Sequence, residues 1–467
     1  MLEKKDYITV NNSIQRFVHK KTGDIFVPIG VNYFPRGTGW APKIWNRSQV
    51  AEYERDFPRI KALGMNIIRV FLSFKKLMPQ PNQMDQNVLT YIRELLECAE
   101  KYDIRVIFSG PSAWDGTPEW AEPLKETWDL YYSDSFILEQ LSFCWSKVAE
   151  VCKDFSSMFS YDLFNEPAIP WKAKGYEKLW ADFVDKLVAK ETDSSKIEVL
   201  KAHKDTIPEN NFKGNREVLF AYQMFRNQIS YDFCKICCDS IRSVDENHMI
   251  TIGSHQCTVP LDCGAPSRFV AFDPHYIGDL LDYVSLHFYP YDEAMDIGED
   301  INNFEKCQNL FSAYINYMDI GKPIMLEEFG LYGGGAAPDF PWRPPFKYLS
   351  QQVSADWVCK TIVRNRSCCS GFLNWGFDDH PDCKDPTRYQ GFYDDDGNIK
   401  ELGKAIPGVI KSTNEYISGS PAYIKKTPLE LDVKDILTSQ EACWSFVRKV
   451  IDGYDKLDNP YIITKNI

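Results

Sequence analysis

The chain has 467 residues, a length that fits one large barrel or two medium-sized domains. Hydrophobic residues make up 44% and charged residues 25% of it, which excludes wholesale disorder, and a net charge of −13 argues against a nucleic acid partner. The sequence has no run of 18 apolar residues and no apolar signal core near Met1, so we expect no membrane partner and a cytoplasmic protein.

Short apolar runs alternate with amphipathic helical stretches along most of the chain, which is the pattern of repeated β/α units. Ile14–Val18 and Ile25–Val27 come first and predict a β-hairpin that closes the bottom of a barrel. Eight runs then predict parallel strands: Phe26–Val31, Asn66–Phe71, Arg105–Phe108, Ser160–Phe164, Met249–Ile252, Tyr283–His287, Pro323–Leu326 and Gly371–Trp375. Eight repeats favour an α/β fold of the (β/α)8 TIM-barrel class over a doubly wound sheet.

Two segments depart from this repeat. The insertion after the fourth strand, residues 171–217, contains a predicted helix at Tyr176–Lys190, and we expect it to lie over the barrel mouth as a cap. After residue 412 the β/α pattern ends. Residues 1–412 are therefore predicted to form the catalytic barrel, and residues 413–467 a short C-terminal helical extension with one helix near Gln440–Tyr454.

Two glutamates follow predicted strands at the end where such barrels carry their active sites. Glu166 comes directly after the fourth strand and Glu328 after the seventh. Cleavage of a glycosidic bond needs two carboxyl groups of this kind, because one protonates the departing oxygen while the other acts at the anomeric carbon. Glu327 is expected on the opposite side of its strand from Glu328, as a salt-bridged or rim residue.

Five sequence elements in strand order resemble glycoside hydrolase family 5, the cellulase and mannanase group of (β/α)8 retaining glycosidases. The resemblance extends from about residue 25 to residue 410. The elements are Arg69 on the second strand, Asn165-Glu166-Pro167 on the fourth, His287-x-Tyr289 on the sixth, Glu328-Phe329-Gly330 on the seventh and Trp375 on the eighth.

This resemblance implies a role for each catalytic position. Glu166 is expected to be the general acid/base, keeping its proton at neutral pH through the charge of Glu328 and partial burial. Glu328 is expected to be the nucleophile, held ionised by hydrogen bonds from Arg69 and Tyr289. The resemblance also implies sugar contacts: Asn165 with the 2-hydroxyl, His287 near the nucleophile, and Trp375 beneath the sugar.

Further sugar-binding candidates come from loops and strand ends. Trp114 and Trp171 fall in predicted loops and are candidate stacking platforms, and Asn32, in the Asn32-Tyr33 pair after the first strand, resembles mannan-active relatives. His255 is expected to be either a substrate-binding residue or a histidine packed in the core, and the sequence favours neither. The family commonly has a His at the third strand, whereas this chain has Ser109 nearby, which leaves the identity of the bound sugar open.

The function predicted is a retaining glycoside hydrolase acting on β-linked oligosaccharides. Without an export signal the substrates would be imported short chains, and a capped mouth fits exo-action, so we favour a β-mannosidase or manno-oligosaccharide hydrolase. The alternatives are an endo-β-1,4-mannanase, an endo-β-1,4-glucanase, a galactose- or glucose-specific exo-enzyme, and a non-catalytic carbohydrate-binding barrel.

We predict no cofactor and no metal. The glycines at 333–335 are not followed by Lys-Ser/Thr, so they do not predict a phosphate-binding loop. The run Asp378, Asp379, His380 and Asp382 is better explained as an acidic rim of a sugar cleft. The 14 cysteines lack the paired spacing of a zinc site, so we expect buried, reduced thiols.

Overall fold

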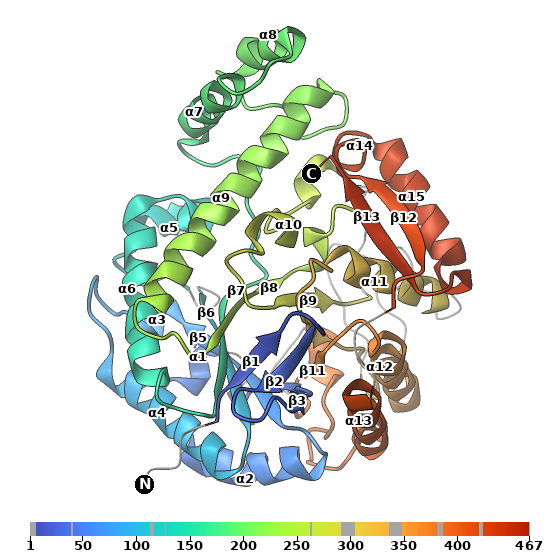
Figure 1. The fold of residues 1–467 in the computed structure, drawn as a ribbon. Coiled ribbons are helices and arrows are strands. Elements are labelled where there is room, and N and C mark those ends of the chain that lie inside the picture. Colours follow the sequence, from blue (N-terminus) through green and yellow to red (C-terminus); the bar gives the residue numbers. More distant parts are fainter. Residues whose placement is uncertain are drawn as a thin grey trace.

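The computed structural model describes residues 6–38, 41–112, 116–126, 128–261, 264–290, 304–335, 348–380, 386–419 and 424–466. Eight parallel strands close into a barrel within a ring of helices, which confirms the (β/α)8 class (Figure 1). All eight predicted strands form. They are β4 (Ile29–Asn32), β5 (Ile67–Ser73), β6 (Arg105–Ser112), β7 (Met158–Asn165), β8 (Met249–Ser254), β9 (Val284–Phe288), β10 (Ile324–Phe329) and β11 (Gly371–Trp375).

The helices pack their apolar faces on the barrel and begin at polar side chains that accept backbone N–H groups. Asp85 begins α4, Asp134 begins α6 and Asn215 begins α9 in this way. None of the described helices combines the length and apolar character that a membrane crossing requires. The α-helices are α1 (Ala41–Ile44), α2 (Val50–Ala62), α3 (Phe74–Leu77), α4 (Gln86–Lys101), α5 (Glu122–Glu126), α6 (Ser135–Cys152), α7 (Tyr176–Val188), α8 (Ser194–His203), α9 (Arg216–Arg242), α10 (Pro274–Ile277), α11 (Phe304–Tyr317), α12 (Gln351–Asn365), α13 (Glu401–Gly419), α14 (Val433–Thr438) and α15 (Gln440–Gly453).

Three short antiparallel strands close one end of the barrel. They are β1 (Ile8–Asn11), β2 (Arg16–His19) and β3 (Ile25–Phe26), and the predicted hairpin corresponds to the pair β2 and β3. The side chain of Phe17 on β2 packs inside the barrel, 5.2 Å from the ring of Phe159 and 5.1 Å from that of Tyr283. The opposite end of the barrel, where the parallel strands finish, is therefore the one left for a site.

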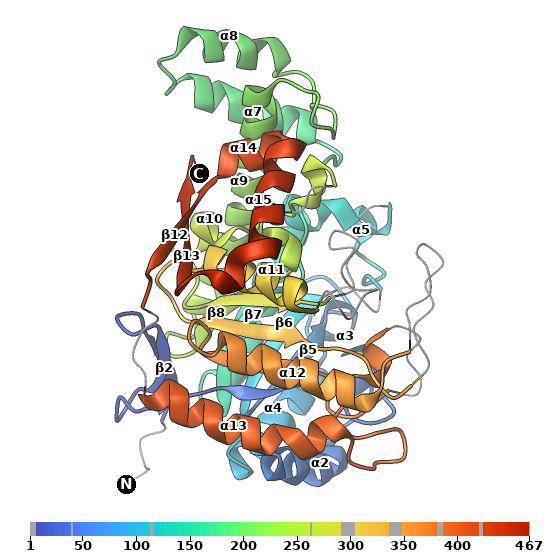
Figure 2. The same ribbon diagram turned by 90° about the vertical axis from the view of Figure 1, so that its right-hand side faces the viewer.

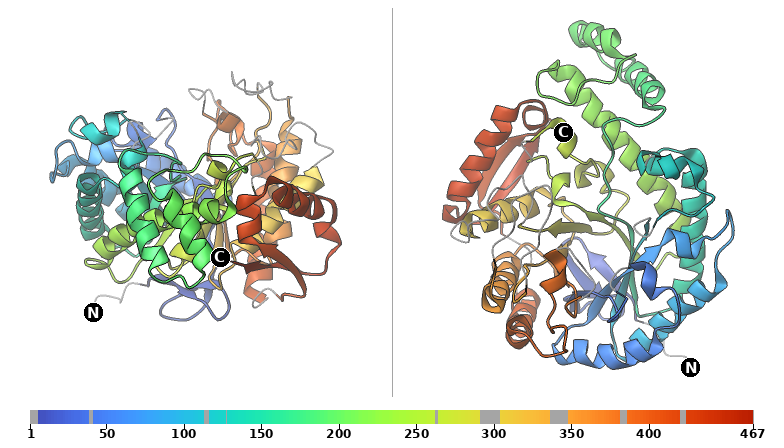
Figure 3. Two further views of the ribbon diagram at one scale, coloured as in Figure 1. Left: turned by 90° about the horizontal axis from the view of Figure 1, so that it is seen from above. Right: turned by 180° about the vertical axis from the view of Figure 1, so that it is seen from behind.

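The insertion after β7 does not cover that end, so the expected cap over the mouth is wrong. Helices α7 and α8 lie beyond the ring of helices, at the flank of the barrel (Figures 1, 2 and 3). The reason is the length of α9, whose 27 residues span about 40 Å and carry its N-terminal part past the barrel. Trp180 of α7 packs on Tyr222 and Phe225 of that part.

The C-terminal segment differs from the predicted helical extension in two respects. Helix α13 runs through residue 412, so the expected boundary falls inside a helix. Residues 427–465 then form an α/β unit in which β12 (Thr427–Asp432) pairs in parallel with β13 (Pro460–Lys465). The unit packs beside α11 and α9 (Figure 2), and its apolar residues, Leu431 and Phe446 among them, belong to the same core as the barrel helices.

Candidate active site

Strand register brings the polar residues predicted from the strand ends to one level of the barrel. Asn32 of β4 lies beside Arg69 of β5 on one side and Trp375 of β11 on the other. Glu328 of β10 lies beside His287 of β9. Because the barrel is closed, these side chains converge at its mouth end.

Arg69 is the centre of this convergence and is completely buried. Its guanidinium donates hydrogen bonds to side chains from four strands. The acceptors are Asn32 (2.9 Å), Ser109 (2.9 Å), Asp162 (2.6 and 3.0 Å), Asn165 (2.8 Å) and Glu328. A buried guanidinium needs such partners, since removing one would leave an uncompensated charge in the interior.

Asp162 is a member of this network that the sequence analysis missed. Burial raises the pKa of its carboxyl to about 6 although Arg69 opposes the rise. Besides Arg69, the carboxylate accepts the backbone N–H of Gly253 at 2.6 Å. Asp162 could have been predicted, because it interrupts an apolar strand just as Arg69 does. The cost of burying an unpaired charge applies to both residues.

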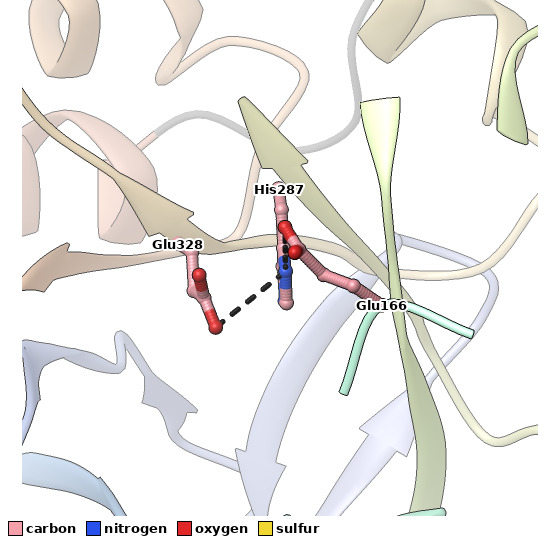
Figure 4. A group of neighbouring side chains, drawn as sticks. All are labelled: Glu166, His287 and Glu328. Carbon is pink, nitrogen blue, oxygen red and sulfur yellow. Dashed lines mark hydrogen bonds and ion pairs between the residues drawn. The ribbon is translucent and has the colours of Figure 1, made fainter. Parts of the chain in front are cut away.

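Glu166 leaves β7 in an unusual backbone conformation. Its φ of 48° is in the left-handed region, which costs a non-glycine residue on the order of 1 kcal/mol. The backbone N–H donates to the carbonyl of Gly253 at 2.8 Å. The side chain keeps 26% of its surface exposed, and Oε1 lies 3.2 Å from Nδ1 of His287 (Figure 4). An incoming ligand can therefore reach this carboxylate.

Glu328 faces Glu166 across the same imidazole but lies deeper, with a side chain 3% exposed. Its Oε1 accepts from Arg69 and lies 3.5 Å from Nδ1 of His287, while Oε2 accepts from the hydroxyl of Tyr289 at 2.9 Å. The two expected donors, Arg69 and Tyr289, are thus both in contact with it. One carboxylate oxygen of each glutamate and a ring nitrogen of His287 lie within 4.8 Å of one another.

The ionisation of the pair differs from the expectation. Burial raises the pKa of Glu166, but His255, His287 and Arg69 outweigh burial and lower it to about 2. The pKa of Glu328 is raised, by burial and by the charge of Glu166. Burial also disfavours charge on His287, yet Glu328, Glu166 and Glu327 raise its pKa to about 9. The surrounding charges therefore favour a proton on His287 over one on Glu166.

Glu327 lies in the barrel interior rather than at the rim, because the register of β10 against β9 shifts between Leu326 and Glu328. The shift lets consecutive residues both face the site. Glu327 is completely buried and accepts a hydrogen bond of 2.6 Å from the hydroxyl of Ser285. The predicted salt bridge is present, because Oε2 of Glu327 lies 3.6 Å from Nε of Arg69.

Aromatic rings form one wall beside the carboxylates. Trp375 contacts Phe34 and Phe71 at centroid distances of 5.4 and 5.7 Å, and Tyr289 packs on the same cluster. Phe34 and Phe71 stack on each other at 5.4 Å and were not predicted from the sequence. Flat rings beside a carboxylate pair are suited to a pyranose, which stacks through its C–H face.

The other predicted binding residues are in different surroundings. Asn32 is completely buried, donates to the carbonyl of Glu327 at 2.8 Å and accepts from Arg69, so it supports Arg69 rather than facing a ligand. His255 follows β8, and its Nδ1 accepts the N–H of Cys257 at 3.0 Å. Trp171 is buried against Tyr222 of α9, with a centroid distance of 4.8 Å. Trp114 lies outside the described residues.

Most of the cysteines whose side chains the structure describes are buried, as expected. Burial raises the pKa of Cys307 to about 12, which keeps that thiol neutral. The one described group with spacing suitable for a metal ion is the trio of Glu166, His287 and Glu328 itself.

Replacing Gly253 by Ala is expected to disturb the site. A Cβ there would lie 2.8 Å from Nη2 of Arg69 and 3.1 Å from both Oδ2 of Asp162 and Cε1 of His287. Overpacking of this kind costs roughly 1–3 kcal/mol, so the melting temperature should fall, and turnover should fall at least about tenfold because charged groups move.

Gly408→Ala is the matched control, since a Cβ at that helical position would meet nothing within 4 Å. It should keep the wild-type turnover and melt at the same or a higher temperature. Equal behaviour of the two variants would contradict the close packing described around Gly253.

The chain is similar to known proteins in both sequence and fold. A family model described as cellulase, glycosyl hydrolase family 5, matches residues 29–377. Among solved structures, the exo-β-1,4-mannosidase Op5Man5 from Opitutaceae bacterium strain TAV5 is similar, with a TM-score of 0.66 and 16% identity over 98% of this chain and 72% of that one. No curated protein matches the chain by sequence.

Two further structures share the fold. A GH5_18 protein from Bifidobacterium longum, solved in complex with Manβ1-4GlcNAc, has a TM-score of 0.64 and 16% identity over 94% of this chain and 91% of its own. The β-galactosidase from Marinomonas ef1 has a TM-score of 0.70 and 14% identity over 94% of this chain and 70% of its own.

Proposed function

The chain belongs to glycosyl hydrolase family 5 and is a glycosidase, and on that premise we propose that it is a retaining β-mannosidase acting on short β-linked oligosaccharides. The observation that carries retention is the approach of the two carboxylates, which have one oxygen each within 4.8 Å of the other, both beside Nδ1 of His287. Retaining enzymes hold their carboxyl groups about 5–5.5 Å apart, whereas inverting enzymes need about 6.5–9.5 Å to admit a water.

In the proposed mechanism Glu328 attacks the anomeric carbon. It is the less exposed carboxylate, and two donors, Arg69 and the hydroxyl of Tyr289, hold its two oxygens in place. Attack forms a glycosyl ester on Glu328 while the bond to the leaving-group oxygen breaks. Glu166, the more exposed member, protonates that oxygen and later takes a proton from the water that cleaves the ester.

Asn165 and the aromatic wall would position the sugar. The Oδ1 of Asn165 accepts from Arg69, whereas its Nδ2 is buried with no hydrogen-bond partner among the described residues. A buried N–H group of this kind is free to donate to a sugar hydroxyl. Trp375 would face the ring of the same sugar.

The choice of mannose is supported by two of the similar structures. One is an exo-β-1,4-mannosidase, and the other holds Manβ1-4GlcNAc. Exo-action is supported by the similarity to the exo-β-1,4-mannosidase alone. The insertion that was expected to block the cleft gives no support, because it lies at the flank of the barrel. A β-galactosidase is the second candidate, favoured by the TM-score of 0.70 to the Marinomonas enzyme.

A panel of 4-nitrophenyl β-D-glycosides tests the proposal. The β-mannoside is expected to be hydrolysed fastest, and proton NMR of the first minutes of reaction should show β-mannose before mutarotation. In a timed digest of β-1,4-mannopentaose, mannose and mannotetraose should appear first.

Other results have defined meanings. If the NMR spectra show α-mannose first, retention is contradicted. If the β-galactoside in the panel is hydrolysed faster than the β-mannoside, the second candidate is favoured. If mannobiose and mannotriose appear first in the digest, the enzyme is endo-acting. Sugar binding without turnover on every glycoside would support the non-catalytic barrel.

A further inference from the structure

The imidazole of His287 has a carboxylate on each side. Nδ1 lies 3.2 Å from Oε1 of Glu166 and 3.5 Å from Oε1 of Glu328 (Figure 4), and Nε2 lies 3.7 Å from Oε2 of Glu327. An imidazole with one proton can donate on one side only, whereas an imidazolium donates on both. The ring is 1% exposed, so solvent contributes little to its hydration.

Glu327 is fixed as an anion on the Nε2 side. Burial opposes its charge, but Arg69, His287 and Ser285 together lower its pKa below the usual range. Ser285 donates to Oε2, the same oxygen that faces His287. This carboxylate is completely buried and cannot reach a substrate, so any part it has in catalysis acts through His287 or Arg69.

We propose that Glu327, His287 and Glu166 form a proton relay, in which Glu327 keeps one proton on Nε2 of His287 and Nδ1 exchanges the catalytic proton with Glu166. At 3.7 Å the contact between Nε2 and Glu327 is an ion pair rather than a hydrogen bond, so Glu327 acts on the ring through its charge. Glu327 is then a positioning residue, and the inference rests on the glycosidase mechanism proposed above.

The relay balances over one catalytic cycle. The proton on Nδ1 moves to Oε1 of Glu166, leaving a neutral His287 that still carries its Nε2 proton. Neutral Glu166 protonates the glycosidic oxygen as Glu328 forms the ester. In the second half, Glu166 takes a proton from the attacking water and returns it to Nδ1, and Glu328 leaves as the carboxylate.

The charges around His287 favour a second proton on the ring in the resting state. Carboxylates outnumber cations there, and the raised pKa of about 9 agrees with this excess. The charged groups that act on the ring are Glu166 just after β7, Arg69 from β5, and Glu327 and Glu328 from β10, while His255 after β8 acts on Glu166.

Glu327→Gln tests the relay through a pH profile. Losing the anion beside Nε2 removes a charge that stabilises the imidazolium, so the site loses its proton at a lower pH. The alkaline limb of kcat/KM should move down by roughly one to three pH units. Glu327→Asp, which keeps the charge, should restore most of that shift.

Asp245→Asn is the matched control. Asp245 is a buried carboxylate that holds a different histidine, with Nδ1 of His248 at 2.6 Å, ahead of β8 and away from the mouth. Its variant loses a buried acid–histidine contact without touching the relay, so its alkaline limb should stay at the wild-type pH.

The leaving group gives a second readout. Glu327→Gln should slow substrates with poor leaving groups at least about tenfold more than 2,4-dinitrophenyl glycosides, which need little acid assistance. If Glu327 has only a structural role, the variant should slow substrates with poor and with good leaving groups equally and leave the alkaline limb of kcat/KM at the wild-type pH. That result would overturn the relay.

Nitrogen-15 NMR of the imidazoles keeps the inference separate from the proposed function. The chain has 7 histidines, and the signal missing from His287→Asn assigns this one. Wild type should carry protons on both nitrogens at pH 7 and should lose the Nδ1 proton first, and Glu327→Gln should lose it at lower pH. A ring that is singly protonated at pH 7, or whose titration is unchanged by Glu327→Gln, would contradict the relay even if the protein hydrolyses every glycoside. If the spectra are as expected but the protein has no turnover, only the proposed function is contradicted.

Discussion

Glu328→Ala is expected to lower kcat by about 10⁵-fold on every glycoside, because the carboxylate that attacks the anomeric carbon is lost. This corresponds to about 7 kcal/mol of transition-state stabilisation. Added azide should occupy the space left by the side chain and attack activated substrates directly. The product should then be the α-glycosyl azide, identified by the NMR coupling of its anomeric proton.

Glu328→Gln is the companion variant. It keeps the size of the side chain and can still accept from Tyr289, so an equally large loss would assign the effect to nucleophilicity rather than packing. Azide should not rescue it, since the site stays filled. Retention of more than about 1% of activity by either variant would contradict the assignment of the nucleophile.

Glu166→Ala is expected to slow hydrolysis of unactivated disaccharides by about 10²–10⁴-fold, the usual contribution of a general acid. With 2,4-dinitrophenyl glycosides the first step needs little acid, so the ester on Glu328 should form quickly and accumulate as a burst. Azide should then release it as the β-glycosyl azide, the opposite anomer from that expected for Glu328→Ala.

The two azide products distinguish the roles without any assumption about the sugar. Mass spectrometry should also find the sugar on the peptide containing Glu328 in the Glu166→Ala protein. The same anomer from both variants, or a sugar on another residue, would sink the division of roles between the two glutamates.

Much of the site could be predicted because parallel strands of a barrel finish at one end. Placing Glu166 and Glu328 after the fourth and seventh apolar runs was sufficient to bring them together, and the burial of Arg69 follows from its place inside an apolar strand. The same argument would have found Asp162. These inferences need only strand order and the cost of burying charge.

Other features depend on distances that a sequence does not contain. Strict alternation turns Glu327 away from Glu328, and only the register shift in β10 brings both into the barrel. The ionisation of Glu166 depends on how closely His287 approaches it, and the sequence does not contain that distance. The position of the insertion depends on how far α9 extends past the barrel, which helix periodicity does not show.

The C-terminal α/β unit has a consequence for how this protein is made. Among the described residues between α9 and α11, the one α-helix is the four-residue α10, and the unit packs against both flanking helices. Leu431 and Phe446 share a core with elements translated more than a hundred residues earlier. On the ribosome, therefore, the barrel would emerge with one flank uncovered, and this nascent surface stays open to aggregation or chaperone binding until residues 427–465 have emerged.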